Sequence, residues 1–245
     1  MANRFPQASA ANAEPQSYAQ IRRLVASAIA GVDSKTAALD QLLVGARQVQ
    51  LTDGETLAGR GDPFPFLVIV QTGELELGIV APTGRRHVIA RLTDGQTFGF
   101  VPMFEGTAIY DSRAVRATRV LLIRREAILT ALRGNAALAV KLLEQHIARQ
   151  RLLFEFISFQ AILPPLGRTA NTLLTLIGLA KPGAEAGRKP MELRLTQGDI
   201  ADMMGISRQN LNTHLKALAN DGLIALKYGA IEILDPAALR ALGAP

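Results

Sequence analysis

Cysteine and tryptophan are absent from this chain of 245 residues, and aromatic residues make up only 5% of it. Without cysteine, the chain cannot form disulfides, thiolate zinc sites or cysteine-ligated iron–sulfur clusters, and it cannot use a cysteine nucleophile. Long hydrophobic runs are also missing, because the richest, residues 64–70, is far shorter than the roughly 18 apolar residues of a membrane span. The first seventeen residues carry only Arg4 as a basic residue and lack the apolar region of a signal peptide. We therefore expect a cytoplasmic protein with no membrane partner.

The composition that remains is apolar and basic. Hydrophobic residues make up 49% of the chain, enough to bury a substantial core, and the formal net charge is +6. A basic balance is compatible with a polyanionic partner, but alone it does not separate nucleic acid from an anionic membrane surface. The three histidines, His87, His146 and His214, are far apart in the sequence. The clustered His and Glu ligands of a cupin-like enzyme are therefore not indicated, and we expect neither catalytic residues nor a metal site.

Residues 196–223 carry the pattern of a helix-turn-helix motif. Thr196 and Asp199 form the Thr-x-x-Asp variant of a capping box, which predicts the start of a helix, and Gly205 predicts its end. Ser207 predicts the N-cap of a second helix. Leucines then recur at helical spacing at 211, 215 and 218. This spacing leaves a polar set facing outward, which consists of Arg208, Gln209, Asn212, Thr213 and Lys216.

Two short apolar runs behind the second helix, residues 223–226 and 230–234, flank the turn signal Tyr228-Gly229. They predict a two-stranded wing. A winged helix of this kind suits DNA, because its outward polar side chains can reach the edges of bases. The alternative is an ordinary helical hairpin with a polar outer face.

The chain between residues 48 and 123 is organised differently. Short alternating or apolar runs are separated by turn signals such as Asp53-Gly54, Thr72-Gly73 and Asp94-Gly95. The runs cover residues 46–51, 64–70, 73–80, 87–92, 112–118 and 120–123. Regular turns of this kind predict a small β barrel or roll. Short helices are expected before it, at residues 21–29 and 37–44.

The order of these turns resembles a cyclic-nucleotide-binding jelly roll, and with the winged helix behind it the chain from about residue 20 resembles the Crp/Fnr family of transcriptional regulators. The resemblance implies an α+β architecture with an N-terminal jelly-roll or β-roll sensor domain, a long dimerisation helix and a C-terminal winged helix-turn-helix. The expected boundaries are a tail at 1–20, the roll at 21–135, the dimerisation helix at 136–163 and the DNA-binding domain at 164–245.

The helix expected at residues 136–163 spans about 42 Å at 1.5 Å per residue, and Pro164-Pro165 ends it and begins a hinge. One seam with the three-then-four spacing of a coiled coil predicts a dimer interface at Leu142, Gln145, Arg149, Leu152, Phe156 and Phe159, continuing to Leu163. A second apolar face, with Leu143, Leu153 and Ile157, suggests packing against the chain's own β domain. Both contacts can exist together.

The resemblance also implies a cassette that binds cyclic AMP, with a Gly-Glu pair for the ribose hydroxyl and an Arg-Ser pair for the cyclic phosphate. This chain has Gly99-Phe100 and Asp111-Ser112 at those places, so both charged contacts are missing. Arg113 is a poor substitute, because adjacent strand positions point to opposite faces. Apolar residues also stand where hydroxyl residues normally meet the adenine. The candidate effector positions are Gly99, Phe100, Val101, Asp111, Ser112, Arg113, Leu153 and Phe154.

Control by cyclic AMP is therefore not expected. Two readings stay open: the pocket is filled by its own side chains and needs no ligand, or it accepts an effector of different shape and polarity. No cofactor is required by the sequence. Haem is not indicated, because no histidine occupies the cassette position of a haem ligand, and an iron–sulfur cluster of the Fnr type is excluded by the missing cysteines.

The family's recognition helix carries a Ser-Arg-Glu triplet and an arginine four residues later, whereas this chain has Ser207-Arg208-Gln209 and Thr213. Arg208 keeps the fork that reads guanine, which is worth about 1–3 kcal/mol of discrimination. Gln209 suits adenine, and Thr213 suits a thymine methyl or a phosphate, so the operator should depart from the usual half-site. The candidates for phosphate contact are Thr196, Gln197, Ser207 and Lys216, with His214 as a backbone contact.

Together with the resemblance, these residues imply a homodimeric, sequence-specific transcription regulator that binds a two-fold symmetric operator on double-stranded DNA. RNA polymerase is the expected protein partner, and a small-molecule effector of unknown identity is compatible with the roll. The sequence does not tell an activator from a repressor, and it does not identify target genes. The alternative is a ligand-binding signalling module that acts through protein contacts, against which Arg208 and Lys216 argue.

Overall fold

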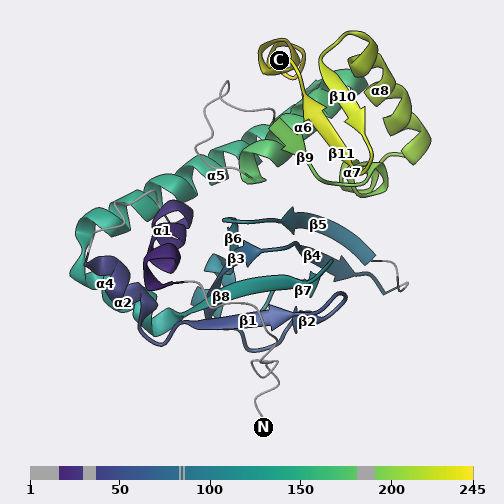
Figure 1. The fold of residues 1–245 in the computed structure, drawn as a ribbon. Helices are drawn as coiled ribbons and strands as arrows, with labels where there is room; N and C mark the ends of the chain where they lie inside the picture. Colours follow the sequence, from purple (N-terminus) through teal and green to yellow (C-terminus); the bar gives the residue numbers. More distant parts are fainter. Residues whose placement is uncertain (1–16, 30–36, 83, 85, 181–190, 245) are drawn as a thin grey trace. The chain divides into compact units, whose positions relative to one another are not determined.

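The computed structural model describes residues 17–29, 37–82, 84, 86–180 and 191–244. The chain divides into two compact units, Met1–Glu144 and Gln145–Pro245 (Figure 1). The division lies within a single long helix, α5 (Ala136–Ile162). Most of the tail expected at residues 1–20 lies outside the described residues.

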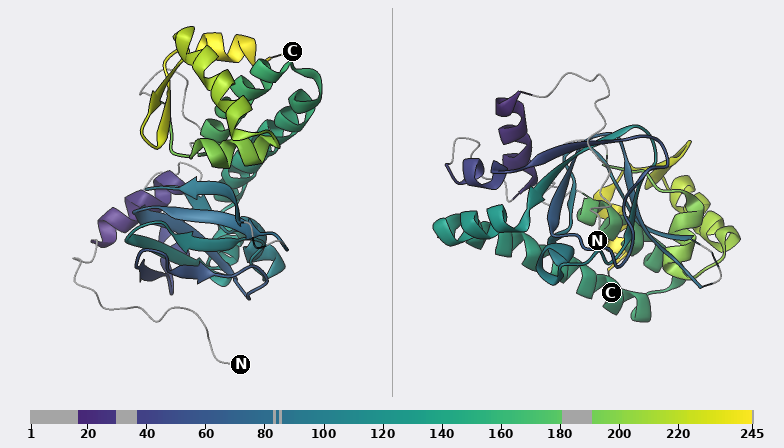
Figure 2. Two further views of the ribbon diagram at one scale, coloured as in Figure 1. Left: turned by 90° about the vertical axis from the view of Figure 1, so that its right-hand side faces the viewer. Right: turned by 90° about the horizontal axis from the view of Figure 1, so that it is seen from below.

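The first unit contains two four-stranded antiparallel sheets that lie face to face (Figure 2). One has the order β1-β8-β3-β6 and the other the order β2-β7-β4-β5. The strands are β1 (Arg47–Leu51), β2 (Thr56–Ala58), β3 (Phe66–Thr72), β4 (Leu75–Val80), β5 (Arg86–Leu92), β6 (Thr97–Phe98), β7 (Asp111–Ala114) and β8 (Thr118–Arg124). The expected roll is therefore present, with β2 and β6 as short strands that the sequence pattern did not predict.

Strand β3 shows how alternation builds two cores from one run of apolar residues. Val68 and Val70 point between the sheets, whereas Leu67 and Ile69 point to the opposite face, where helices cover the sheet. The tight turn after β3 requires glycine, because Gly73 has φ +102° and a Cβ there would lie 2.6 Å from the carbonyl oxygen of Ala117.

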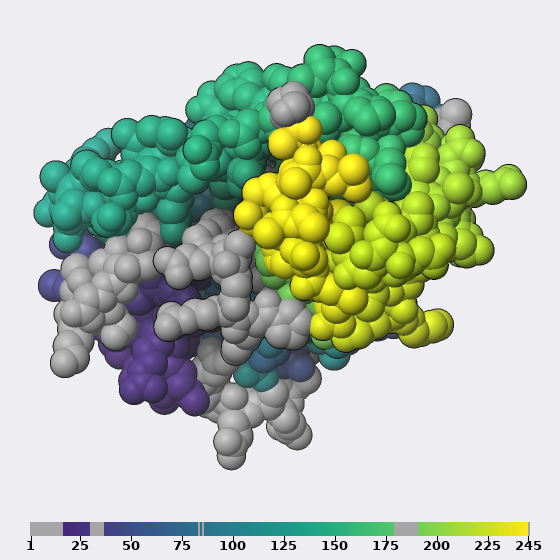
Figure 3. All heavy atoms as spheres, turned by 90° about the horizontal axis from the view of Figure 1, so that it is seen from above, coloured from purple at the N-terminus to yellow at the C-terminus, as the bar shows by residue number. Residues whose placement is uncertain are grey.

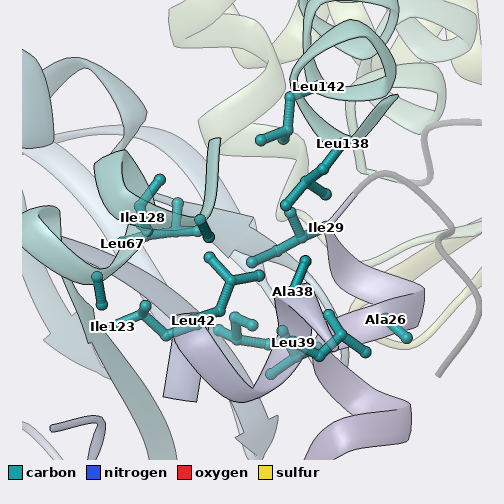
Figure 4. Packing of buried hydrophobic residues seen from close by; sticks show 14 of the residues in the cluster. Ala26, Ile29, Ala38, Leu39, Leu42, Leu67, Ile123, Ile128, Leu138 and Leu142 are labelled. Carbon is teal, nitrogen blue, oxygen red and sulfur yellow. The ribbon is translucent and has the colours of Figure 1, made fainter. Parts of the chain in front are cut away.

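The helical side of the first unit consists of α1 (Tyr18–Ala28), α2 (Ala38–Leu43), α4 (Arg125–Gly134) and the first turns of α5. Leu138 and Leu142 point from α5 into the same buried cluster as Ile29 and Leu42 (Figure 4). Helix α1 begins at Tyr18 rather than at the expected Ile21, because Ser17 and Gln20 form a reciprocal capping box.

The second unit contains the rest of α5 and the helices and strands that follow it. These are α6 (Pro165–Ala180), β9 (Met191–Leu193), α7 (Gln197–Met204), α8 (Arg208–Asn220), β10 (Ile224–Lys227), β11 (Ala230–Ile233) and α9 (Pro236–Leu242). The expected wing is the hairpin β10–β11, and β9 pairs with β11 as a third strand. Helix α9 packs against α6, and the two are adjacent in the space-filling view (Figure 3).

Two further features differ from the sequence expectations. The run expected at residues 112–118 is divided: β7 ends at Ala114, and Thr118 already belongs to β8. Residues 100–105 form the helix α3 (Phe100–Glu105). Within the described part of the chain, no helix is both long enough and apolar enough to cross a bilayer.

Candidate functional site

Helices α7 and α8 are held at their ends by local hydrogen bonds. The Thr196 hydroxyl accepts from the backbone N–H of Asp199, and the Asp199 carboxylate accepts from the N–H of Thr196, both at 3.1 Å. Gly205 ends α7 in the left-handed conformation, with φ 66°. The Ser207 hydroxyl then caps α8 by accepting from the N–H of Asn210 at 3.1 Å. The predicted helix-turn-helix is thus present with the predicted caps.

The two faces of α8 have opposite character. Leu211, Leu215 and Leu218 are fully buried, as their spacing predicts. The outward set is exposed at Arg208, Gln209, Thr213 and Lys216, and half-buried at Asn212. A rigid helix therefore presents a guanidinium, an amide, a hydroxyl-bearing side chain and an ammonium group on its solvent side. Asn210, which the sequence reasoning did not select, is also exposed on the first turn.

Hydroxyl groups around this surface are partly committed to the backbone. Thr213 donates to the carbonyl oxygen of Gln209 at 3.2 Å, so its methyl group and its acceptor lone pairs are what it can offer to a partner. Thr196 and Ser207 use their oxygens as cap acceptors and keep their O–H donors for an outside acceptor. Gln197 is half-buried at the start of α7.

The wing carries a further cation, Lys227. Lys227 Nζ lies 2.8 Å from Glu232 Oε2, and the hydrogen bond and negative charge of Glu232 raise the pKa of Lys227. Tyr228 at the wing tip is fully exposed, and Gly229 makes the turn with φ 68°. Neither Lys227 nor Tyr228 is predicted as a site residue by the sequence, in which Tyr228 serves only as part of the turn signal of the wing.

His214 does not behave as the sequence reasoning expected. Its ring is half-buried, and Nδ1 lies 2.9 Å from the hydroxyl oxygen of Thr169 on α6. The side chain thus bonds inside its own unit rather than pointing outward as a backbone contact would.

Asp111, at the cassette position where the family resemblance implies an arginine, is bonded to other residues of the roll. Asp111 Oδ1 accepts from the backbone N–H of Arg60 at 2.8 Å, and Asp111 Oδ2 lies 4.0 Å from Arg86 Nη1. Ser112 is buried and its hydroxyl bonds both the N–H of Ala58 at 3.1 Å and the carbonyl oxygen of Ala58 at 3.2 Å. The two side chains at the Arg-Ser position are therefore bonded within the roll, to the backbone of Arg60 and Ala58.

The neighbouring cassette residues do not replace the missing contacts. Arg113 is exposed and donates from Nε to the carbonyl oxygen of Gly54 at 2.8 Å. Phe100 packs against the helix-covered core of the first unit, and Val101 is exposed. Gly99 must be glycine, because a Cβ there would lie 2.4 Å from the carbonyl oxygen of Phe66.

The space between the two sheets is filled by apolar and aromatic side chains. The rings of Phe64 and Phe98 are stacked with centroids 6.1 Å apart, and Phe66 meets Phe64 edge-on at 5.6 Å. Tyr110 packs against the same cluster. Across the part of the chain that the structure describes, no group of three or more His, Cys, Asp or Glu residues is arranged to hold a metal ion.

Helix α5 shows two kinds of apolar positions. Leu142, on the predicted seam, is buried in the first unit's core, while Gln145, Arg149, Leu152, Phe156 and Phe159 are half-buried. A neighbouring apolar seam is exposed, with steps of three, four, seven and three residues, and it consists of Val140, Leu143, Ile147, Phe154 and Ile157. Leu153 is exposed as well. Burial and the nearby charge of Arg149 lower the pKa of His146.

Comparison with known proteins agrees with these two units. Residues 48–135 match the family model of the cyclic nucleotide-binding domain, and residues 167–242 match that of the Crp-like helix-turn-helix domain. Over 194 residues the chain is 27% identical to the CRP-like cAMP-activated global transcriptional regulator of Mycobacterium tuberculosis, covering 77% of this chain and 86% of that protein. It is 26% identical over 190 residues to the cyclic AMP receptor protein of Thermus thermophilus, covering 76% and 83%.

Solved structures show the same fold. FixK2 from Bradyrhizobium japonicum superposes with a TM-score of 0.63 at 21% identity, covering 82% of this chain and 98% of that one. TTHA1359, a CRP/FNR-family transcriptional regulator from Thermus thermophilus, gives a TM-score of 0.53 at 24% identity and covers 80% and 98%.

Proposed function

Because the chain belongs to the Crp/Fnr family of DNA-binding transcription regulators, which are not enzymes, we propose that it acts as a homodimer on a two-fold symmetric operator. The observation that carries this proposal is the exposed polar face of α8, with Arg208 at its N-terminal end and a fully buried leucine face behind it. RNA polymerase is the proposed protein partner. The cytoplasm, where chromosomal DNA is accessible, is the proposed location.

Base reading is assigned to three side chains of this face. The Arg208 fork matches the O6 and N7 acceptors of guanine, and the Gln209 amide matches adenine. Thr213, whose hydroxyl proton is engaged by the Gln209 carbonyl, offers its methyl group to a thymine. The phosphate contacts that set the register are assigned to Thr196, Gln197, Ser207 and Lys216. Asn212 is assigned to the edge of the contact, because it is half-buried.

Dimerisation is assigned to α5. Its exposed seam, Val140, Leu143, Ile147, Phe154 and Ile157, has the spacing of a two-stranded coiled coil and leaves large apolar side chains in solvent in the single chain. The predicted seam of Leu142, Gln145, Arg149, Leu152, Phe156 and Phe159 is already half-buried or buried within the chain. We place the centre of the dimer contact on the exposed seam, with Gln145, Arg149 and Phe156 at its margin.

Cyclic AMP is not the proposed effector, although relatives of the chain are named for it. A phosphate approaching the cassette would meet the carboxylate of Asp111, and displacing that carboxylate would break its bond to the N–H of Arg60. Phe100 and Val101 are apolar, the Ser112 hydroxyl is bonded to Ala58, and Arg113 donates from Nε to the carbonyl oxygen of Gly54. The roll then works either without a small ligand or with an effector that is not a cyclic mononucleotide.

The proposal is tested by selecting operators from a random duplex library with the full chain at fixed salt. We expect a palindromic consensus, a dimer by light scattering and a two-to-one stoichiometry of chain to duplex. Recovery of no selective sequence, or a monomer on the selected duplex, contradicts the proposal. Cyclic AMP should change neither the operator affinity nor the melting temperature of the chain. The melting temperature is a sensitive check, because a ligand that binds the native state, present at 100 times its Kd, adds about 2.7 kcal/mol to the free energy of unfolding.

A further inference from the structure

His214 is a polar residue close to the apolar, buried face of α8. On α8 it lies between Leu211 and Leu215, which are fully buried, and its ring is half-buried beside helix α6. A polar side chain in such a place must find a partner or cost stability. The partner is Thr169, a fully buried residue of α6.

The direction of this hydrogen bond follows from proton counting. The Thr169 hydroxyl donates its single proton to the carbonyl oxygen of Pro165 at 3.1 Å. The same oxygen lies 2.9 Å from Nδ1 of His214. Both contacts are satisfied together only if Nδ1 carries a proton and donates it to Thr169. The chain of bonds therefore runs from the recognition helix, through Thr169, to the first turn of α6.

A second buried hydroxyl of α6 makes the matching connection to the long helix. Gln160, near the end of α5, donates from Nε2 to the hydroxyl oxygen of Thr172 at 3.1 Å, and Thr172 donates to the carbonyl oxygen of Arg168 at 2.8 Å. Thr169 and Thr172 lie within one turn of each other, on a helix that begins directly after Pro164. Helix α6 is thus bonded through two hydroxyl groups to both α5 and α8.

We propose that His214 is a positioning residue for base reading, and that its bond to Thr169 sets how α8 is seated on α6. This inference rests on the proposed function, because it concerns how the DNA-reading face is oriented. The leucine face of α8 supplies affinity for the core but little direction, since hydrophobic contacts are non-directional. A hydrogen bond has a preferred distance and angle, and it fixes the rotation of the helix.

Orientation matters because the contacts assigned to Arg208 are themselves directional. A bidentate pair with guanine is lost when a helix turns by a few tens of degrees, whereas charge attraction to phosphates falls off slowly. Loss of the Thr169–His214 bond should therefore weaken specific binding more than non-specific binding. The Gln160–Thr172 bond connects α6 to α5 in the same way. The orientation of α8 is therefore coupled through α6 to the helix assigned to dimerisation.

The experiment compares substitutions that remove or keep the bond in the full-length dimer. Thr169→Val removes the hydroxyl at nearly constant volume, and Thr169→Ser keeps it. His214→Leu removes the donor, and His214→Asn keeps an N–H donor close to the position of Nδ1. Thr175→Val makes the same change at another buried threonine of α6 and is the matched control. The measurement is the ratio of Kd values for scrambled and selected duplexes at one salt concentration.

We expect Thr169→Val and His214→Leu each to lower this ratio about five-fold, the value of one hydrogen bond. Thr169→Ser, His214→Asn and Thr175→Val should leave it near the wild-type value. The double variant Thr169→Val/His214→Leu should be no worse than either single variant, because the two residues share one bond. Nitrogen NMR of the imidazole should show the proton on Nδ1 in the wild type.

Three results overturn the inference. The first is a lowered melting temperature with an unchanged ratio, which means that the bond only adds stability. The second is additive loss in the double variant, and the third is a ring with its proton on Nε2 alone. Failure of the proposed function would look different, because the wild-type dimer would then select no operator at all.

Discussion

The recognition helix begins with Ser207-Arg208, and the cassette of the roll has Asp111-Ser112. The polar side chains of the helix are exposed, whereas those of the cassette are bonded within the fold. On α8 the side chains of Arg208, Gln209 and Lys216 are exposed. In the cassette the Asp111 carboxylate and the Ser112 hydroxyl are bonded to backbone groups of Arg60 and Ala58. A polar residue can serve a ligand only if the fold has not already used its hydrogen-bonding groups. This contrast, more than the identity of the residues, separates the surface proposed to bind DNA from the site that we propose does not bind cyclic AMP.

The largest expected effect comes from the helix that joins the two regions. Ile157→Asp places a charge in the exposed seam of α5, and in the proposed dimer that carboxylate would be buried without a partner. We expect conversion to a monomer in light scattering and loss of operator binding by at least about 100-fold, because one half-site alone remains. Val44→Asp changes an equally exposed apolar residue of the first unit and is the control. A dimeric Ile157→Asp variant would contradict the assigned seam.

Removal of the exposed guanidinium tests the DNA-binding side of the comparison directly. Arg208→Ala should weaken binding to the selected operator by about 1–3 kcal/mol while changing non-specific binding much less. Arg240→Ala removes an equally charged, exposed side chain from α9 of the same unit and should affect both duplexes slightly and equally. Equal loss on both duplexes by Arg208→Ala would reassign this residue to a phosphate contact.

The cassette should respond in stability rather than in binding. Ser112→Ala leaves the N–H and the carbonyl oxygen of Ala58 without their buried partner, and we expect a loss of about 1–3 kcal/mol in the free energy of unfolding. Operator affinity of the folded variant should stay unchanged. Ser27→Ala, at an exposed position of α1, is the control and should fall within about 0.5 kcal/mol of the wild type in denaturant titration.

The smallest effect concerns His146 on α5. Because burial and Arg149 lower its pKa from 6.5, the folded chain holds the proton less tightly than the unfolded chain does. Stability should therefore be complete above the unfolded value and should decline as pH falls below about 6.5. His146→Gln should reduce this decline in thermal melts between neutral and mildly acidic pH. An unchanged slope would show that other groups cause the acid sensitivity.

Much of the DNA-binding unit could be predicted because its signals are local. The capping pairs Thr196–Asp199 and Ser207–Asn210 join residues three positions apart, and the leucines of α8 repeat with the helical period. The strands of the roll were visible for the same reason, since alternation and glycine turns are properties of short segments. The shortest strands, β2, β6 and β9, carry too few residues to show a period.

The rest depended on residues that meet only after folding. Nothing near Asp111 in the chain indicates that the N–H of Arg60 would bind it, and nothing near His214 points to Thr169. The sequence also did not separate the two apolar seams of α5, because both have spacings that fit a coiled coil. Only packing against other elements buries Leu142 and leaves Leu143 exposed. Local periodicity sets which helices and strands form, since it acts through bonds between near neighbours. Which polar groups stay available to a ligand was decided by tertiary packing, because each hydrogen bond that the fold makes with itself removes a donor or acceptor from the surface.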